Sequence, residues 1–363
     1  GHLRVVRARR RAGLDGVTRS LALGVLDQSP IVSGHSPADA VRETIGLAEA
    51  AEALGYSRYW LAEHHAIAAL ADPCPEILLA RIAATTSRMR VGTGGVLLPY
   101  YAPLKVAEVF RMLEAIAPGR IDLGIGRAPG GDLTTARALA NGEYSHAAEF
   151  PEQVADLVGF LDGTLPQNHP FKRVKAMPEV ESAPQVWLLG SSDYSGALAA
   201  HLGLRFAFAH FINAQGGDAV MRAYKERFRP SPRESAPANA LCVFVICAET
   251  DDEAERLAAS IDLRRLHMAT GVDAPVPTLI EAHAHRYTDR ERAYVAAQRE
   301  RIVLGGPEKV KARLEALAAQ YAADELLILT ITGDYESRRR SYELLAGAFG
   351  LTAERQPRRH EDT

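Results

Sequence analysis

The sequence predicts an α/β fold, a (β/α)8 TIM barrel with loop insertions, and three observations lead to this expectation. Short apolar segments alternate with amphipathic segments of helical period, a pattern typical of parallel strands covered by helices. Eight strand segments of this kind occur, and no obvious linker divides them. The 363-residue chain is 47% hydrophobic, and α/β barrels routinely exceed about 250 residues as one domain.

The expected strands are short and apolar, as strands buried on both faces are. In chain order they are 21–28, 57–64, 89–93, 120–126, 185–189, 204–210, 240–248 and 325–330. The first helix opens at Ser36-Pro37, a capping residue followed by proline, and ends at Gly55. Helices are expected at 37–54, 75–87, 104–117, 151–161, 192–202, 217–228, from 251, from 307, and at 336–349. The stretches 163–184 and 266–301 follow neither pattern, so we expect a long loop and an insertion there.

The chain ends differ in composition from the barrel region. Residues 1–20 are rich in arginine and are expected to be disordered or added during cloning. A twin-arginine export signal would need an apolar segment after it, and 21–26 serves better as the first strand. We therefore expect one domain at 21–350, followed by a polar C-terminal tail at 351–363.

Net charge, the length of apolar runs and the cysteine content limit the partners and the cellular location that we expect. The net charge is -3 and no apolar run reaches about 18 residues, so neither nucleic acid nor a membrane is an expected partner. Cys242 and Cys247 lie five residues apart on an expected strand, which places their side chains on opposite faces and prevents a disulfide between them. With Cys74 they form a poor disulfide framework, which favours a cytoplasmic location.

A Glu-His-His cluster, Glu63 to His65, ends the second expected strand. Catalytic groups in a (β/α)8 barrel sit where strands end and loops begin. Adjacent histidines on an extended strand point in opposite directions and cannot share a metal ion, and the helical HExxH spacing is absent. An imidazole that titrates near neutrality suits proton transfer. We expect a catalytic or ligand-contacting role for at least one histidine and no metal site, although a structural histidine is the alternative.

Three glycine-rich strand ends predict a site for a flat, phosphorylated ligand. Gly94 and Gly95 follow the third strand, where absent side chains let the backbone approach a ring closely. Arg127 follows the fourth strand in a segment whose glycine spacing and proline do not fit a dinucleotide fingerprint, so it is expected to bind phosphate. Hydroxyl residues open the helix after the fifth strand, where backbone N–H groups also attract phosphate; they are Ser191, Ser192 and Ser195. The alternatives are a tight turn and an ordinary serine cap.

Taken together, these segments resemble the luciferase-like (bacterial luciferase family) flavin-dependent monooxygenases, and among them a subgroup associated with antibiotic biosynthesis and so with secondary metabolism. The resemblance covers about residues 21–349 in the expected order. It is carried by LAEHH, VGTGGVLLPYYAPLKVAE, PGRIDLGIGRAPGG, VWLLGSS and GGPEKV.

The resemblance implies a TIM barrel that binds FMN at the carboxyl ends of its strands. His64 matches the catalytic histidine of the family, and Glu63 precedes it in the flavin pocket. Gly94-Gly95 matches a non-prolyl cis peptide bond under the isoalloxazine ring. The residues that match the phosphate contacts are Arg127, Ser192 and Ser195, with Ser191 beside them.

The implied activity is that of an FMN-dependent monooxygenase. Reduced FMN would come from a separate NAD(P)H:flavin reductase, O2 would be activated as a flavin C4a-hydroperoxide, and one oxygen atom would enter a small organic substrate. The family commonly pairs subunits through the helices that flank strands two and three, so a homodimer is expected. Luciferase has a reactive cysteine where this chain has Gly126, so light emission is not implied. The alternatives are a deazaflavin-dependent hydride-transfer oxidoreductase, a non-catalytic flavin-binding barrel, and a metal-dependent hydrolase using His64 and His65.

Overall fold

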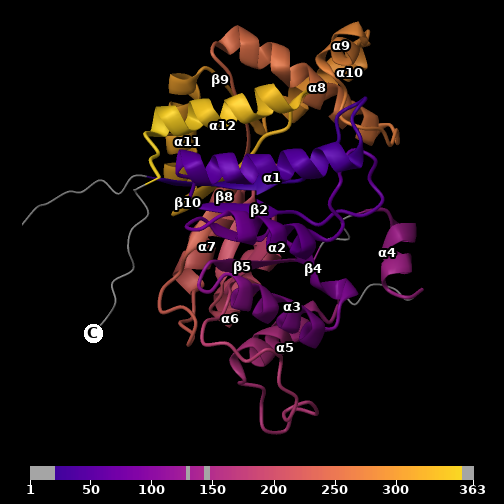
Figure 1. Ribbon diagram of the computed structural model, residues 1–363. Helices are drawn as coiled ribbons and strands as arrows, with labels where there is room; N and C mark the ends of the chain where they lie inside the picture. The colour runs from indigo at the N-terminus through magenta and orange to yellow at the C-terminus, as the bar shows by residue number, and fades with distance from the viewer. Residues whose placement is uncertain (1–20, 128–130, 143–147, 354–363) are drawn as a thin grey trace, which may run out of the picture.

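The computed structural model describes residues 21–127, 131–142 and 148–353, and within them the predicted barrel is present (Figure 1). Every strand pairing is parallel, and the pairing of β8 with β10 closes the ring β1-β2-β3-β5-β6-β7-β8-β10. The barrel strands are β1 (Ala22–Asp27), β2 (Arg58–Leu61), β3 (Arg90–Thr93), β5 (Ile121–Gly126), β6 (Gln185–Gly190), β7 (Arg205–Ala209), β8 (Asn239–Cys247) and β10 (Glu325–Leu329).

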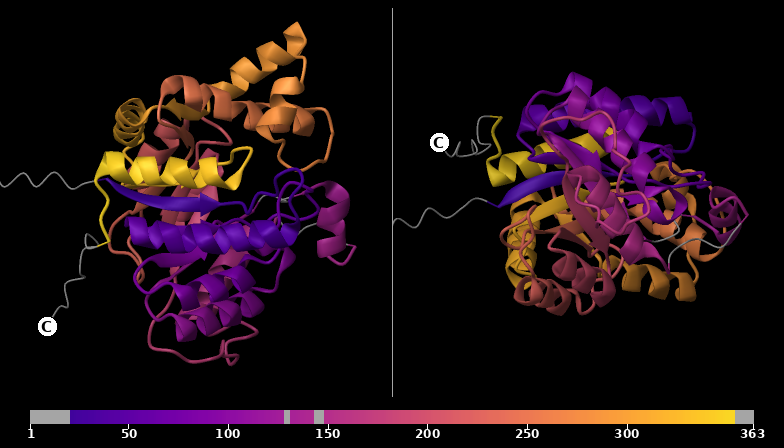
Figure 2. Two further views of the ribbon diagram at one scale, coloured as in Figure 1. Left: turned by 45° about the horizontal axis from the view of Figure 1, so that its top comes forward. Right: turned by 90° about the horizontal axis from the view of Figure 1, so that it is seen from below.

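Helices cover the outside of the barrel, as the alternating pattern predicts (Figure 2). The helices of the described residues are α1 (Pro37–Leu54), α2 (Pro75–Thr85), η1 (Leu98–Tyr100), α3 (Pro103–Ile116), α4 (Leu133–Leu139), α5 (Phe150–Asp162), α6 (Asp193–Leu202), α7 (Gly217–Arg227), α8 (Asp251–Ala269), α9 (Leu279–Ala284), α10 (Asp289–Arg299), α11 (Pro307–Gln320) and α12 (Tyr335–Phe349). Ser36 caps α1 and Gly55 ends it in left-handed conformation, both as expected. No helix of the described residues is both long and apolar enough to span a membrane.

The structure corrects one part of the sequence-based description. The stretch 266–301 is mostly helical: α8 runs on to Ala269, and α9 and α10 follow, standing out from the body in Figure 1. Capping boxes at Thr278 and Thr288 open these two helices. α10 has no fully buried residue, and its Tyr294 is only partly buried against the cluster of Leu263, Leu266 and Ala282, so its apolar period is weak. The stretch 163–184 contains no helix or strand, as predicted.

Two short strands and one helix were not anticipated. β4 (Val96–Leu97) continues the direction of β3 and pairs with the end of β5, and β9 (Ile302–Gly305) pairs with the last residues of β8. Both extend the sheet at the carboxyl ends of the barrel strands. α4 lies in the segment that follows β5.

Two apolar layers hold the barrel together. The inner layer includes Leu26, Trp60, Trp187 and Cys242, and the outer layer, between strands and helices, includes Cys247. Cys242 and Cys247 therefore lie on opposite faces of β8, as expected, and all three cysteines are free. This double burial explains why the strands read as nearly continuous apolar runs.

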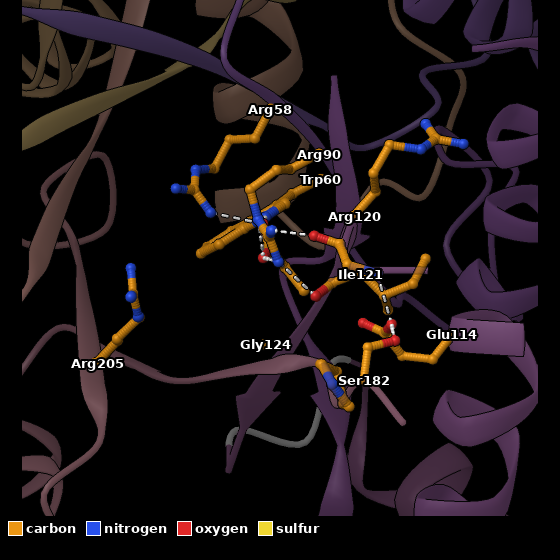
Figure 3. Close-up of polar contacts among 12 residues, drawn as sticks. Arg58, Trp60, Arg90, Glu114, Arg120, Ile121, Gly124, Ser182 and Arg205 are labelled. Atoms are coloured by element: carbon orange, nitrogen blue, oxygen red, sulfur yellow. Dashed lines mark hydrogen bonds and ion pairs between the residues drawn. The ribbon is translucent and has the colours of Figure 1, made fainter. Parts of the chain in front are cut away.

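The amino ends of the strands are closed by a buried charge network (Figure 3). Arg58 at the start of β2 donates to Asp122 at 2.5 Å and to Glu325 at 2.9 Å, and Arg90 donates to Asp122 at 2.8 Å. Figure 3 shows Arg58 and Arg90 converging beside Trp60, whose indole N–H also donates to Asp122. Burial by itself would raise the pKa of Asp122, but the two guanidinium groups outweigh it and hold the pKa below its usual value. The open end of the barrel is therefore the opposite one, where the strands finish.

Candidate active site

A cavity of about 270 Å³ lies at the carboxyl ends of the barrel strands. All of the residues that the sequence singled out as catalytic or cofactor-binding line it. They are Glu63, His64, Gly94, Gly95, Arg127, Ser191, Ser192 and Ser195. They come from the ends of β2, β3, β5 and β6, so the parallel sheet brings together segments that are up to about 130 residues apart in the chain.

A larger cleft of about 960 Å³ lies elsewhere, between α8, α10 and α11. Its basic side chains are largely neutralised, because Arg299 pairs with Asp262 at 2.6 Å and Lys309 with Asp251 at 3.0 Å. None of the residues predicted to be functional lines it. We therefore place the chemistry in the smaller cavity at the strand ends.

Glu63 is buried and anchors the wall of the cavity. Its carboxylate accepts a hydrogen bond from the Leu97 backbone N–H at 2.9 Å and from the Tyr101 hydroxyl at 2.6 Å, and lies 2.7 Å from His65 Nε2. These contacts tie the end of β2 to β4 and to the turn that follows η1. Tyr101 thereby fixes the orientation of the Glu63 carboxylate. These contacts fix Glu63 in the wall of the cavity, next to His64.

His64 is half-buried, and its side chain is less constrained than that of His65. Its backbone N–H donates to the Asp72 carbonyl at 3.1 Å, while its Nδ1 is shielded from solvent and has no hydrogen-bond partner among the described residues. Burial, and to a smaller extent the positive charge of Arg264, lowers the pKa of His64 to about 4. The imidazole is therefore neutral at physiological pH and has a nitrogen available for a ligand.

Gly94 and Gly95 form a surface that no other residue could supply. A Cβ on Gly94 would lie 2.6 Å from Leu26 Cδ1, and one on Gly95 would lie 2.6 Å from the Gly124 carbonyl oxygen. The peptide bond between them is cis, as the family resemblance implied. Since both glycines line the cavity, bare backbone is presented to it at this point.

Cationic and hydroxyl groups gather on the side of the cavity formed by β5 and β6. Arg127 is exposed, and its guanidinium carbon lies 4.3 Å from the centre of the Tyr194 ring. Ser192 is the N-cap of α6, yet its hydroxyl caps no backbone N–H. Ser195 packs against Gly190, where any Cβ would collide with the serine Oγ. Arginine, free hydroxyls and a helix N-terminus together suit the dianion of a phosphate monoester.

The remaining wall of the cavity is apolar, and sequence reasoning did not identify it. It includes Leu97, Ala207, Phe211 and Ile212. Such residues carry no chemical signature, since apolar side chains at strand ends look like ordinary core. Their position beside the cavity follows only from the closed barrel.

Comparison with known proteins agrees with this geometry. The family described as luciferase-like monooxygenase matches residues 22–325. The Bacillus subtilis (strain 168) protein YceB is 46% identical over 90% of this chain and 99% of its own length. The N-acetyl-S-alkylcysteine monooxygenase of the same organism is 35% identical over 92% of this chain and 100% of its own length. The crystal structure of apo-MsnO8 superimposes with a TM-score of 0.85 at 41% identity, covering 92% of this chain and 99% of that one.

The match spans most of the chain, and the relatives are aligned over nearly their whole length. The chain therefore belongs to the luciferase-like monooxygenase family and is a flavin-dependent monooxygenase.

Proposed function

We propose that this protein uses reduced FMN and O2 to insert one oxygen atom into a small organic substrate. The observation that carries the proposal is one cavity that brings together a bare diglycine backbone, an arginine, serine hydroxyls and an imidazole whose Nδ1 has no partner among the described residues. Each of these features fits one part of FMN. Arg127, Ser192 and Ser195, with Ser191 beside them, would hold the phosphate, and Gly94-Gly95 would support the isoalloxazine ring.

When bound, reduced FMN would supply the electrons that activate O2. The contribution of the chain is to bind, orient and exclude water. Leu97, Phe211 and Ile212 form an apolar wall that limits access of water to the reacting atoms. His64 is neutral, so it can accept a proton at one ring nitrogen and donate one from the other without carrying a standing charge. Glu63 acts as a positioning residue, because its carboxylate is already engaged by Tyr101, Leu97 and His65.

The reductant would be delivered by a separate NAD(P)H:flavin reductase, because the glycine-rich segment after β5 lacks the spacing of a dinucleotide fingerprint. We also propose a homodimer. Ile77 on α2 is 67% exposed, and Met112 and Ile116 on α3 are 54% and 48% exposed. These are the helices that flank strands two and three, and large exposed apolar side chains are typical of a subunit interface.

A flavin-loading experiment tests this function. The protein is titrated with FMN and with reduced FMN under anaerobic conditions, and then mixed rapidly with O2. We expect binding of reduced FMN and a long-lived absorbance of oxygenated flavin; with substrate present, one atom of 18O should enter the product. Reduction of a deazaflavin without O2 uptake would instead identify a hydride-transfer enzyme. Flavin binding without any oxygenated species would identify a binding protein.

A further inference from the structure

Arg264, on α8, is a buried arginine without a partner. It is 7% exposed, and its Nε is shielded from solvent with no hydrogen-bond acceptor among the described residues. No ion pair reaches its guanidinium within the described parts of the chain. Burial lowers the pKa of Arg264 to about 10, and the negative charge of Asp273 opposes this only in part. A buried charge is costly to a fold unless a counter-charge and hydrogen bonds compensate it.

Other buried arginines of this protein are compensated in that way. Arg58, also 7% exposed, meets the carboxylates of Asp122 and Glu325. Arg338, 2% exposed, meets Asp27 at 2.5 Å. The unpaired state of Arg264 is therefore an exception among the buried arginines of the described residues, and it indicates a position prepared for a group that these residues do not supply.

Arg264 lies on the face of α8 that is turned toward the mouth of the barrel. Ile261, three residues earlier and so on the same helix face, belongs to the inner apolar layer together with Trp60 and Cys242. The adjacent Arg265 lies with its guanidinium carbon 5.1 Å from the centre of the Phe244 ring, which also belongs to that layer. This stretch of α8 thus packs over the interior of the barrel.

The segment after α8 returns to the loop that carries His64. Val276 pairs with Val32 after β1, and Asp273 accepts a hydrogen bond from the Ala68 backbone N–H at 2.9 Å. Arg264 is near enough to His64 for its charge to act on the imidazole. Arg264 is not among the residues that line the cavity, but the segment that follows it contacts the loop that carries His64.

We propose that Arg264 binds a carboxylate of the organic substrate and thereby orients the substrate toward His64 and the flavin. The inference rests on the proposed function, because it names the substrate class of the same cavity. That class is a small organic acid whose remaining part is apolar, to match Leu97, Phe211 and Ile212. A planar guanidinium can hold a carboxylate through two parallel hydrogen bonds, which fixes orientation as well as position.

Thermal unfolding of Arg264→Met without ligand gives a first test. A residue that awaits a substrate is an unpaired charge in the free protein, so its replacement by an apolar side chain of similar length should raise Tm by at least about 2 °C. Arg265→Met is the matched control. Arg265 already donates to the Gln298 carbonyl at 2.9 Å, so its loss should lower Tm. A fall in Tm for Arg264→Met would indicate a structural role and overturn the proposal.

Ligand binding gives the second test and uses defined probes. Hexanoate, decanoate and N-acetyl-S-benzylcysteine are each compared with their methyl esters by thermal shift and calorimetry on the FMN-loaded protein. We expect at least one acid to bind about 100-fold more tightly than its ester, Arg264→Met to abolish the difference, and Arg264→Lys to restore part of it. The proposal is overturned if no acid binds, if acid and ester bind equally, or if the preference survives in Arg264→Met.

The two proposals fail in distinguishable ways. Binding of FMN and O2 uptake with reduced FMN are measured on the wild-type protein without substrate, so they test the monooxygenase proposal independently of Arg264. An acid preference without O2 uptake would remove the monooxygenase proposal and keep the carboxylate site. O2 uptake without an acid preference would keep the monooxygenase proposal and remove the carboxylate site.

Discussion

His65 Nε2 lies 2.7 Å from the carboxylate of Glu63, and this contact separates the roles of two adjacent histidines. The carboxylate commits His65 to the frame of the cavity, together with Tyr101. His64 lies between Glu63 and His65 in the chain, and its Nδ1 has no partner among the described residues. Among the described residues, no group of His, Cys, Asp and Glu is arranged to hold a metal ion. We therefore propose that His64, rather than His65, handles protons.

Replacement of His64 by alanine should abolish product formation while leaving flavin binding nearly intact. A positioned proton donor or acceptor contributes about 100- to 10,000-fold to a rate, so turnover should fall by at least about 100-fold. FMN affinity should change by less than about threefold, since the phosphate contacts are elsewhere. The measurement is product yield by mass spectrometry beside an FMN titration. His201→Ala, at the exposed end of α6, is the control, and unchanged turnover in His64→Ala would refute the assigned role.

Replacement of Arg127 by alanine should remove the preference of the protein for FMN over riboflavin. The two flavins differ by the phosphate, so the Kd for FMN should rise about 10- to 100-fold while that for riboflavin stays constant. Both constants are obtained by fluorescence quenching. Arg137→Ala, an exposed arginine on α4, serves as the control. Equal weakening of both flavins would place Arg127 at the ring or in the fold rather than at the phosphate.

Replacement of Gly190 by alanine should displace Ser195 and so weaken binding of the FMN phosphate. The new Cβ would collide with the side chain of Ser195, so the first turn of α6 must shift. We expect FMN affinity to fall at least about tenfold and the free energy of unfolding to fall by about 1–3 kcal/mol. Gly347→Ala is the matched control: no atom lies within 4 Å of its added Cβ, and alanine in a helix should stabilise by up to about 1 kcal/mol. A crystal structure of Gly190→Ala with an unmoved α6 would contradict this account.

Replacement of Asp72 by asparagine should stabilise the protein at alkaline pH and have little effect in acid. Asp72 is 2% exposed, one of its oxygens has no partner among the described residues, and burial raises its pKa to about 7. Because the folded-state pKa lies above the unfolded value of 3.8, the contribution of the neutral acid is complete below pH 3.8 and is lost as pH rises through 7. The Tm of Asp72→Asn minus that of wild type should increase from pH 5 to pH 7 and level off above pH 7, so it is larger at pH 8.5 than at pH 5.

The control for this pH dependence is Asp132→Asn. The Thr135 backbone N–H and hydroxyl hold the pKa of Asp132 below its usual value, so this exposed cap is ionised at pH 5 and at pH 8.5 alike. Its Tm difference should not change with pH. A pH-independent difference for Asp72→Asn as well would show that Asp72 does not titrate between pH 5 and 8.5.

The alternating apolar and amphipathic segments were enough to predict eight barrel strands and their helices, because periodicity and capping are local properties of the chain. They were also enough to select Glu63, His64, Gly94, Gly95, Arg127 and three serines, because each stands where a strand ends. Parallel strands put their carboxyl ends at one rim, so position along the chain predicted a shared cavity.

Only the tertiary structure decided what each of these groups does there. By residue type alone His64 and His65 are equivalent neighbours. The family resemblance selects His64, and the contact of Glu63 with His65 supplies a physical difference between them. It shows Arg264 as one arginine of a polar helix, and burial without a carboxylate sets it apart from Arg58 and Arg338. The physical reason is that the free-energy cost of burying a charge depends on the groups that surround it. Those surroundings are assembled from residues as far apart as Asp27 and Arg338, which no local pattern brings together.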